Sequence, residues 1–118
     1  MTRMAFLAAT SLAAFALAVQ AGAMSHPKLQ GDVGPGFTIH LKRNGATVKQ
    51  LVPGTYTITV SDKSSIHNFH LTGPGVNKQI TSVSFTGSKT VTVTFKKGLY
   101  KYVCDPHVAT MKGSFKVG

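Results

Sequence analysis

The chain has 118 residues, a length typical of a single domain. It contains one cysteine, which excludes a fold held together by disulfides within the chain. Its 13 lysines and arginines outnumber 3 acidic residues and give a net charge of +10. The basic residues are scattered, with no row of aromatic residues among them, which argues against a nucleic-acid-binding barrel. The excess charge favours an acidic partner or an anionic surface instead.

Residues 1–23 have the pattern of a secretory signal peptide. A short basic start (1–4) is followed by an apolar run (5–19) and by small residues that end at Ala23. A membrane-spanning helix would need about 20 apolar residues, and this run is shorter, so we expect no stable membrane insertion. We predict export to the periplasm or the exterior. Cleavage after Ala23 would remove Arg3 and leave 12 basic residues against three aspartates, a net charge of +9.

The rest of the chain predicts β-structure. Residues 24–35, which contain His26-Pro27 and run into Gly34-Pro35-Gly36, are predicted to be a loose leader. From residue 36 onward apolar and polar residues alternate between turn signals, a pattern typical of half-buried strands, and no stretch predicts a helix. The expected strands are 37–41 (ending at Asn44-Gly45), 56–60, 67–72, a weaker candidate at 80–85, 90–95, 99–104 and 113–117. About seven or eight short strands predict an all-β domain over residues 36–118, a sandwich or a small barrel.

The segment 104–111 concentrates metal-binding side chains. Cys104 and His107 are separated by two residues, so both can face one metal from a tight loop, which Pro106 stiffens by fixing φ. Met111 adds a thioether at the end of the segment. Two histidines, one cysteine and a weak axial methionine form the ligand set that is diagnostic of blue copper. The competing interpretations are a buried structural cysteine, a methionine that fills the core, and a zinc site.

A second histidine must come from another strand, and strand parity selects it. In the predicted strand 67–72, His67 shares a face with Phe69 and Leu71, whereas His70 lies on the opposite, polar face. His67 should therefore point into the core and is the predicted ligand, with His70 kept as a reserve. His40 is expected to face solvent from its strand, and His26 lies in the leader.

These motifs resemble those of the cupredoxins, close to small bacterial proteins of the plastocyanin, amicyanin and pseudoazurin type. The resemblance covers nearly all of residues 36–118 and rests on three motifs: Val60-Ser61-Asp62 before His67-Asn68, Gly98-Leu99-Tyr100 before Cys104, and Cys104-x-x-His107 before Met111. It implies a Greek-key fold and one type 1 copper bound by His67, Cys104, His107 and Met111. It also implies that Asn68 ties the two ligand loops together.

The spacing of the methionine differs from the family pattern. Three residues separate His107 from Met111, whereas plastocyanin and pseudoazurin have four and amicyanin has two. Met111 is nevertheless the predicted axial ligand, since its spacing lies between those of working family members.

The predicted function is that of an exported one-electron carrier and not an enzyme, because four protein ligands leave no open position for a substrate. The alternative is a periplasmic protein for copper delivery or storage. The resemblance implies that electrons leave through His107, whose neighbours Pro106, Val108 and Ala109 are apolar. Lys63 and Lys112 should surround this exit with positive charge, so we expect a monomer whose redox partner has an acidic docking surface.

Overall fold

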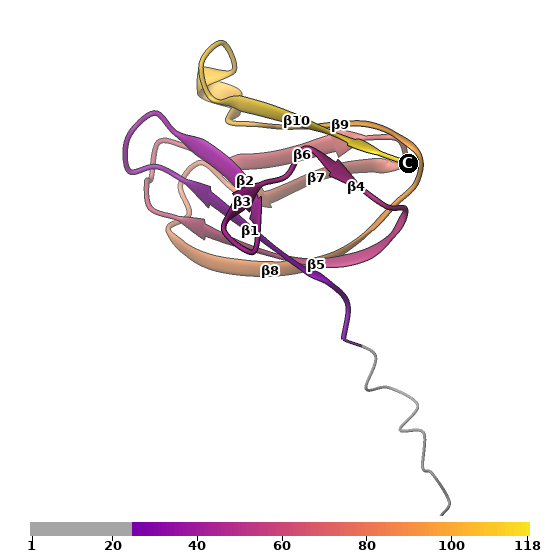
Figure 1. Cartoon of the computed structure of the whole chain (residues 1–118). Helices are drawn as coiled ribbons and strands as arrows, with labels where there is room; N and C mark the ends of the chain where they lie inside the picture. The colour runs from indigo at the N-terminus through magenta and orange to yellow at the C-terminus, as the bar shows by residue number, and fades with distance from the viewer. Residues whose placement is uncertain (1–24) are drawn as a thin grey trace, which may run out of the picture.

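The structure, a computed structural model, describes residues 25–118, which form two β-sheets that pack on one another (Figure 1). The first sheet has the strand order β3-β2-β1-β5-β8 and the second has the order β4-β10-β9-β6-β7. The strands are β1 (Lys28–Val33), β2 (Ile39–Arg43), β3 (Ala46–Thr47), β4 (Gln50–Leu51), β5 (Gly54–Asp62), β6 (Phe69–Gly73), β7 (Val76–Thr81), β8 (Gly87–Phe95), β9 (Gly98–Val103) and β10 (Lys112–Val117). The prediction of an all-β sandwich is confirmed.

Helical structure among the described residues is limited to one 3₁₀ turn, η1 (Asp105–His107), between β9 and β10. No helix in residues 25–118 is long and apolar enough to cross a membrane. The predicted signal peptide, residues 1–23, lies outside the described residues.

The two faces of β5 show how the sequence pattern produces the sandwich. Tyr56, Ile58 and Val60 are fully buried, whereas the threonines between them face the outside. β5 pairs antiparallel with β8, so the outer hydroxyls of the two strands meet. Thr55 and Thr59 each bond a threonine hydroxyl of β8 at 2.9 Å. The alternation therefore places an apolar face in the core and a polar, cross-bonded face in water.

The leader predicted at residues 24–35 is wrong for residues 28–33, which form β1. This strand pairs antiparallel with β2 and parallel with β5, and its residues Leu29 and Val33 are buried. The alternation was hidden because the buried position between them is Gly31. A Cβ atom there would lie 2.9 Å from Val60 Cγ2 and 3.0 Å from Phe69 Cε2, so only glycine lets β1 approach the core this closely.

Strand boundaries close to the predicted site residues also differ from the prediction. β2 begins at Ile39 and not at Phe37, whose side chain is 62% exposed. β6 begins at Phe69, so His67 lies in the loop before it. β7 ends at Thr81, and the weak strand predicted at 80–85 is instead the end of β7 followed by a turn.

The core between the sheets is rich in aromatic rings. Tyr102 on β9 stacks on Phe69 at 5.6 Å between centroids and 7° between planes. Tyr100 stacks on Phe115 of β10 at 5.5 Å, and its hydroxyl donates to Pro74 O at 2.9 Å. These contacts fix β9 against β6 and β10, and β9 is the strand that leads into the segment 104–111.

Candidate metal centre

Three of the four predicted ligands meet at one end of the sandwich. His67 Nδ1 lies 3.1 Å from His107 Nδ1, and Cys104 Sγ lies 3.6 Å from each of these nitrogens. All three donor atoms lie within 4.8 Å of one another. His67 and Cys104 are completely buried and His107 is half-buried.

These separations match the edges of a small coordination polyhedron. Metal bonds of about 2.0 Å to nitrogen and about 2.3 Å to sulfur, meeting at about 100–115°, place the ligand atoms about 3.1–3.6 Å apart. The observed 3.1 Å and 3.6 Å therefore suit a single first-row metal ion between the three side chains. Thiolate and imidazole donors bind both copper and zinc.

The segment 104–111 is closed by its own backbone hydrogen bonds. Cys104 N donates to Met111 O at 3.0 Å, and Met111 N donates to His107 O at 2.8 Å. His107 N donates to Cys104 O at 3.0 Å, with Pro106 inside this first turn. We call residues 104–111 the ligand loop. Because β9 and β10 pair up to Val103 and Lys112, the sheet fixes both ends of this loop.

Met111 is completely buried at the end of the ligand loop and belongs to the core cluster. The three-residue spacing after His107 closes the loop with the bond between Met111 N and His107 O. Its burial and its position suit the predicted axial role, which remains a prediction.

A second loop, between β5 and β6, delivers His67. Asp62 Oδ1 accepts a hydrogen bond from Ser64 N at 3.0 Å and so turns the chain after β5. Gly34, with φ at +70°, packs against this loop, and a Cβ atom there would lie 2.8 Å from Ser64 Cβ and 3.3 Å from His67 Cδ2. Only glycine combines this backbone conformation with so close an approach.

Phe37 is part of the site, although its sequence pattern predicted only a strand residue. Its ring lies edge-on to His67 at 5.3 Å and to His107 at 4.9 Å between centroids, although 62% of the side chain is exposed. The two histidine rings are themselves edge-on at 4.8 Å. The signal that could have identified it is a large apolar residue after Gly34-Pro35-Gly36, in a turn rather than in a strand.

The remaining histidines lie outside this group of donor atoms. His70 points away from the core, as predicted, and its Nδ1 lies 2.9 Å from Asp105 Oδ2. His40 pairs with Asp32 at 2.8 Å on the other sheet. His26 is exposed ahead of β1. Strand parity therefore predicted correctly that the ring of His67 points inward and that of His70 outward, although His67 lies just before the strand.

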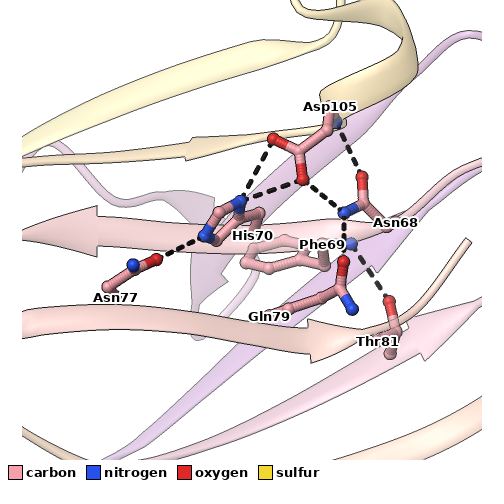
Figure 2. A network of polar contacts seen from close by, with 7 residues as sticks. All are labelled: Asn68, Phe69, His70, Asn77, Gln79, Thr81 and Asp105. Atoms are coloured by element: carbon pink, nitrogen blue, oxygen red, sulfur yellow. Dashed lines mark hydrogen bonds and ion pairs between the residues drawn. The ribbon is translucent and has the colours of Figure 1, made fainter.

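Asn68 joins the two loops, as the resemblance implied. Asp105 N donates to Asn68 Oδ1 at 2.7 Å, and Asn68 Nδ2 donates to Asp105 Oδ2 at 2.7 Å and to Gln79 Oε1 at 3.0 Å (Figure 2). The side chain of Asn68 is completely buried. Each of its amide atoms therefore has a partner in the protein, and the two ligand-bearing loops are locked together.

The pKa of one tyrosine close to the centre is raised. Burial raises the pKa of Tyr102, two residues before Cys104, because the tyrosinate anion would lose its hydration. A hydrogen bond from the backbone of Leu41 opposes this shift in pKa, and the negative charge of Asp32 adds to it.

Comparison with known proteins identifies the metal. The model of the family described as copper binding proteins of the plastocyanin/azurin family matches residues 13–118. Among solved structures, a rusticyanin variant is 24% identical, with 77% of this chain and 76% of that chain covered and a TM-score of 0.58. Rusticyanin from Thiobacillus ferrooxidans is 21% identical, with coverage of 77% and 76% and a TM-score of 0.50.

A heme-copper terminal oxidase is 21% identical, with 77% of this chain and 63% of that chain covered and a TM-score of 0.54. Among curated proteins, none matches the sequence. The solved structures share the fold with this chain, whereas the family match covers most of its length and decides between copper and zinc. The chain belongs to the plastocyanin/azurin family of copper-binding proteins, the cupredoxins, and copper is its cofactor.

Proposed function

We propose that the chain is an exported carrier of single electrons, with His67, Cys104, His107 and Met111 as the ligands of one type 1 copper. Copper supplies the change between Cu(I) and Cu(II). The observation that carries the proposal is the close grouping of the three donor atoms within 4.8 Å at the end of a rigid sandwich. Because strand pairing and the closed ligand loop hold these side chains, little rearrangement is needed between the two oxidation states.

The exposure of the ligands supports a carrier rather than an enzyme. His67, Cys104 and Met111 are completely buried, so they leave no face of the centre to which a substrate has access. His107 is half-buried, which leaves its ring as the route toward solvent. The half-buried ring suits outer-sphere transfer of an electron to a partner that touches the surface.

The surroundings of His107 support a docking surface for a redox protein. Val108 follows it and is 53% exposed, and Phe37 packs on its ring. Lys63 is exposed on the loop that carries His67, and Lys112 is exposed at the start of β10, directly after the ligand loop. Exposed apolar groups with positive charge around them suit a short-lived complex with an acidic partner, with an interface below about 1,200 Å².

Export is proposed from residues 1–23 alone. Mass spectrometry of the protein recovered from a bacterial host should show a mature chain that begins at Met24. A full-length protein retained in the cytoplasm would contradict this part of the proposal.

The central test is to add copper(II) to the metal-free protein and record the visible spectrum and the cyclic voltammogram. We expect an intense blue colour from charge transfer between thiolate and copper, together with a reversible one-electron wave. A protein for copper delivery or storage should instead give up its copper rapidly to a Cu(I) chelator and show no fast electron exchange. A colourless copper complex would contradict both the ligand set and the carrier function.

A further inference from the structure

The side chain of His70 on β6 pairs with that of Asp105 in the ligand loop, on the outer face of the second sheet (Figure 2). His70 lies on β6 opposite Val103 of β9, so its ring stands beside the point where β9 enters the ligand loop. His70 Nδ1 lies 3.1 Å and 2.9 Å from the two carboxylate oxygens of Asp105. His70 Nε2 lies 2.6 Å from Asn77 Oδ1 on β7.

The carboxylate of Asp105 has a second partner. Its Oδ2 also accepts a hydrogen bond from Asn68 Nδ2 at 2.7 Å. His70 on β6 and Asn68, just before β6, therefore both donate to the carboxylate of Asp105. Asp105 is the residue directly after Cys104. Only Asp32, Asp62 and Asp105 are acidic in the whole chain, so a negative charge at this position is unusual for so basic a protein.

We propose that Asp105 and His70 act as a positioning pair that orients the ligand loop and places a partly compensated negative charge beside Cys104, lowering the reduction potential of the centre. The inference deepens the proposed electron-carrier function, on which it rests. A negative charge close to the centre favours the more positive oxidation state, and hydrogen-bonded neighbours of ligands tune metal sites in this way. The side chain of Asp105 is 48% exposed, so water and salt reduce the effect without removing it.

The two members of the pair have opposite effects on the potential. Asp105 supplies the negative charge, and the N–H of His70 offsets part of its field. Asn77 holds the far side of the His70 ring, which fixes the direction of the donor. His70 therefore acts on the centre only through Asp105, and it is a positioning residue rather than the reserve ligand considered from the sequence.

Voltammetry of the copper-loaded protein tests this arrangement. Asp105→Asn keeps the shape of the side chain and removes its charge, so it should shift the potential upward while the blue spectrum persists. His70→Ala should shift it downward, and Asn77→Ala should shift it in the same direction by less. In the Asp105→Asn background, His70→Ala should produce almost no further shift.

The chain offers a matched control in its other aspartate–histidine pair. Asp32 contacts His40 at 2.8 Å on the opposite sheet, so Asp32→Asn makes the same change of charge outside the ligand loop. It should shift the potential less than Asp105→Asn does. Equal shifts in Asp32→Asn and Asp105→Asn, or the same effect of His70→Ala with and without Asp105, would overturn the proposal.

Amide hydrogen exchange on the metal-free protein gives a readout without copper. The N–H of Asp105 donates to Asn68, so His70→Ala should make this amide exchange faster. The N–H of Val48, which donates to Leu41 O on the other sheet, should keep its rate. Unchanged exchange at Asp105 would contradict the positioning role. Since this comparison needs no redox activity, it decides the role of the pair even if the wild-type protein shows no reversible wave and the carrier function fails.

Discussion

Asn68 and Asp105 exchange two hydrogen bonds, each 2.7 Å long, across the gap between the two loops that supply the ligands. Asn68 is completely buried, so loss of its amide would leave the backbone N–H of Asp105 without its partner. We predict that Asn68→Leu, which is similar in volume, lowers the free energy of unfolding by about 1–3 kcal/mol. Urea denaturation of the metal-free protein measures this loss. The same substitution at the partly exposed His70 should cost less, and equal losses would contradict the central role of Asn68.

The visible spectrum distinguishes the ligands from their neighbours. Cys104→Ser should abolish the blue colour, because the thiolate is the source of the charge-transfer band. His67→Ala should also destroy the blue site, since His67 Nδ1 lies 3.6 Å from Cys104 Sγ and faces the other donors. His70→Ala should keep the colour, because its ring faces Asp105 on the outer surface. A colourless His70→Ala protein that still folds would mean that the assignment of the two histidines is wrong.

The axial position is tested by Met111→Leu. Leucine fills a similar volume in this buried position but cannot donate electrons to the metal. Copper should remain bound to the other three ligands, and the potential should rise because the site becomes more apolar and loses a weak donor. Voltammetry of the variant beside the wild type gives the result. An unchanged potential would show that Met111 serves only the core.

Alkaline unfolding should report the raised pKa of Tyr102. The folded state keeps this hydroxyl protonated above its ordinary pKa of 10.0, whereas the unfolded chain loses the proton near that pH. The folded state therefore binds more protons in this range, and the free energy of unfolding must fall as the pH rises past about 10. Below that pH the contribution is constant.

The free energy of unfolding of the wild type and of Tyr102→Phe is measured by denaturation at pH values from about 8 to about 11, on either side of the ordinary tyrosine pKa of about 10. The wild type should lose stability more steeply above pH 10 than the variant does. Ultraviolet absorbance of tyrosinate should also show one tyrosine of the folded wild type that titrates late and is missing in Tyr102→Phe. Parallel stability curves would contradict the shift.

Electron transfer to an acidic partner should slow as salt rises through about 0.1 M, where the Debye length is about 10 Å. Lys63→Glu combined with Lys112→Glu should slow it at low salt and leave the blue spectrum intact. The control is Lys96→Glu combined with Lys97→Glu, which makes the same change of charge at the opposite end, beside the start of β9. Stopped-flow kinetics with an acidic redox protein measures the rate of electron transfer for the two double variants and the wild type. Equal slowing in both double variants would show that the net charge acts without a local docking surface.

Much of this structure could be predicted from the sequence. The alternation in residues 56–60 and 90–95 indicated β5 and β8 because both strands have one buried and one exposed face. Strand β1 was not predicted because the buried position at its centre is glycine. Glycine is needed there because Val60 and Phe69 lie too close for a larger side chain. Because glycine has no side chain, it interrupts the alternation of apolar residues by which a half-buried strand is recognised.

The grouping of the donor residues could be predicted from the sequence, but their surroundings could not. Cys104, His107 and Met111 lie close in the sequence, and parity chose His67 from its neighbours. The partnership of His70 with Asp105 was not visible, since it depends on the register that places His70 opposite Val103. Phe37 was assigned to a strand because it continues the alternation of residues 37–41, but the chain bends before Ile39 and turns its ring onto the histidines.

The parallel pairing of β1 with β5 has a consequence for how the domain can be attached to other structures. β1 runs from Lys28, beside Thr57, toward Gly34, which packs on His67, so the described chain enters at the end remote from the ligands. β10 runs the other way, from Lys112, next to Met111, to Val117 beside Gly98, and it also finishes at the remote end. A tether, a neighbouring domain or an electrode linked through either terminus would therefore hold the protein with its ligand loops turned outward. Immobilised protein should remain open to a redox partner in solution.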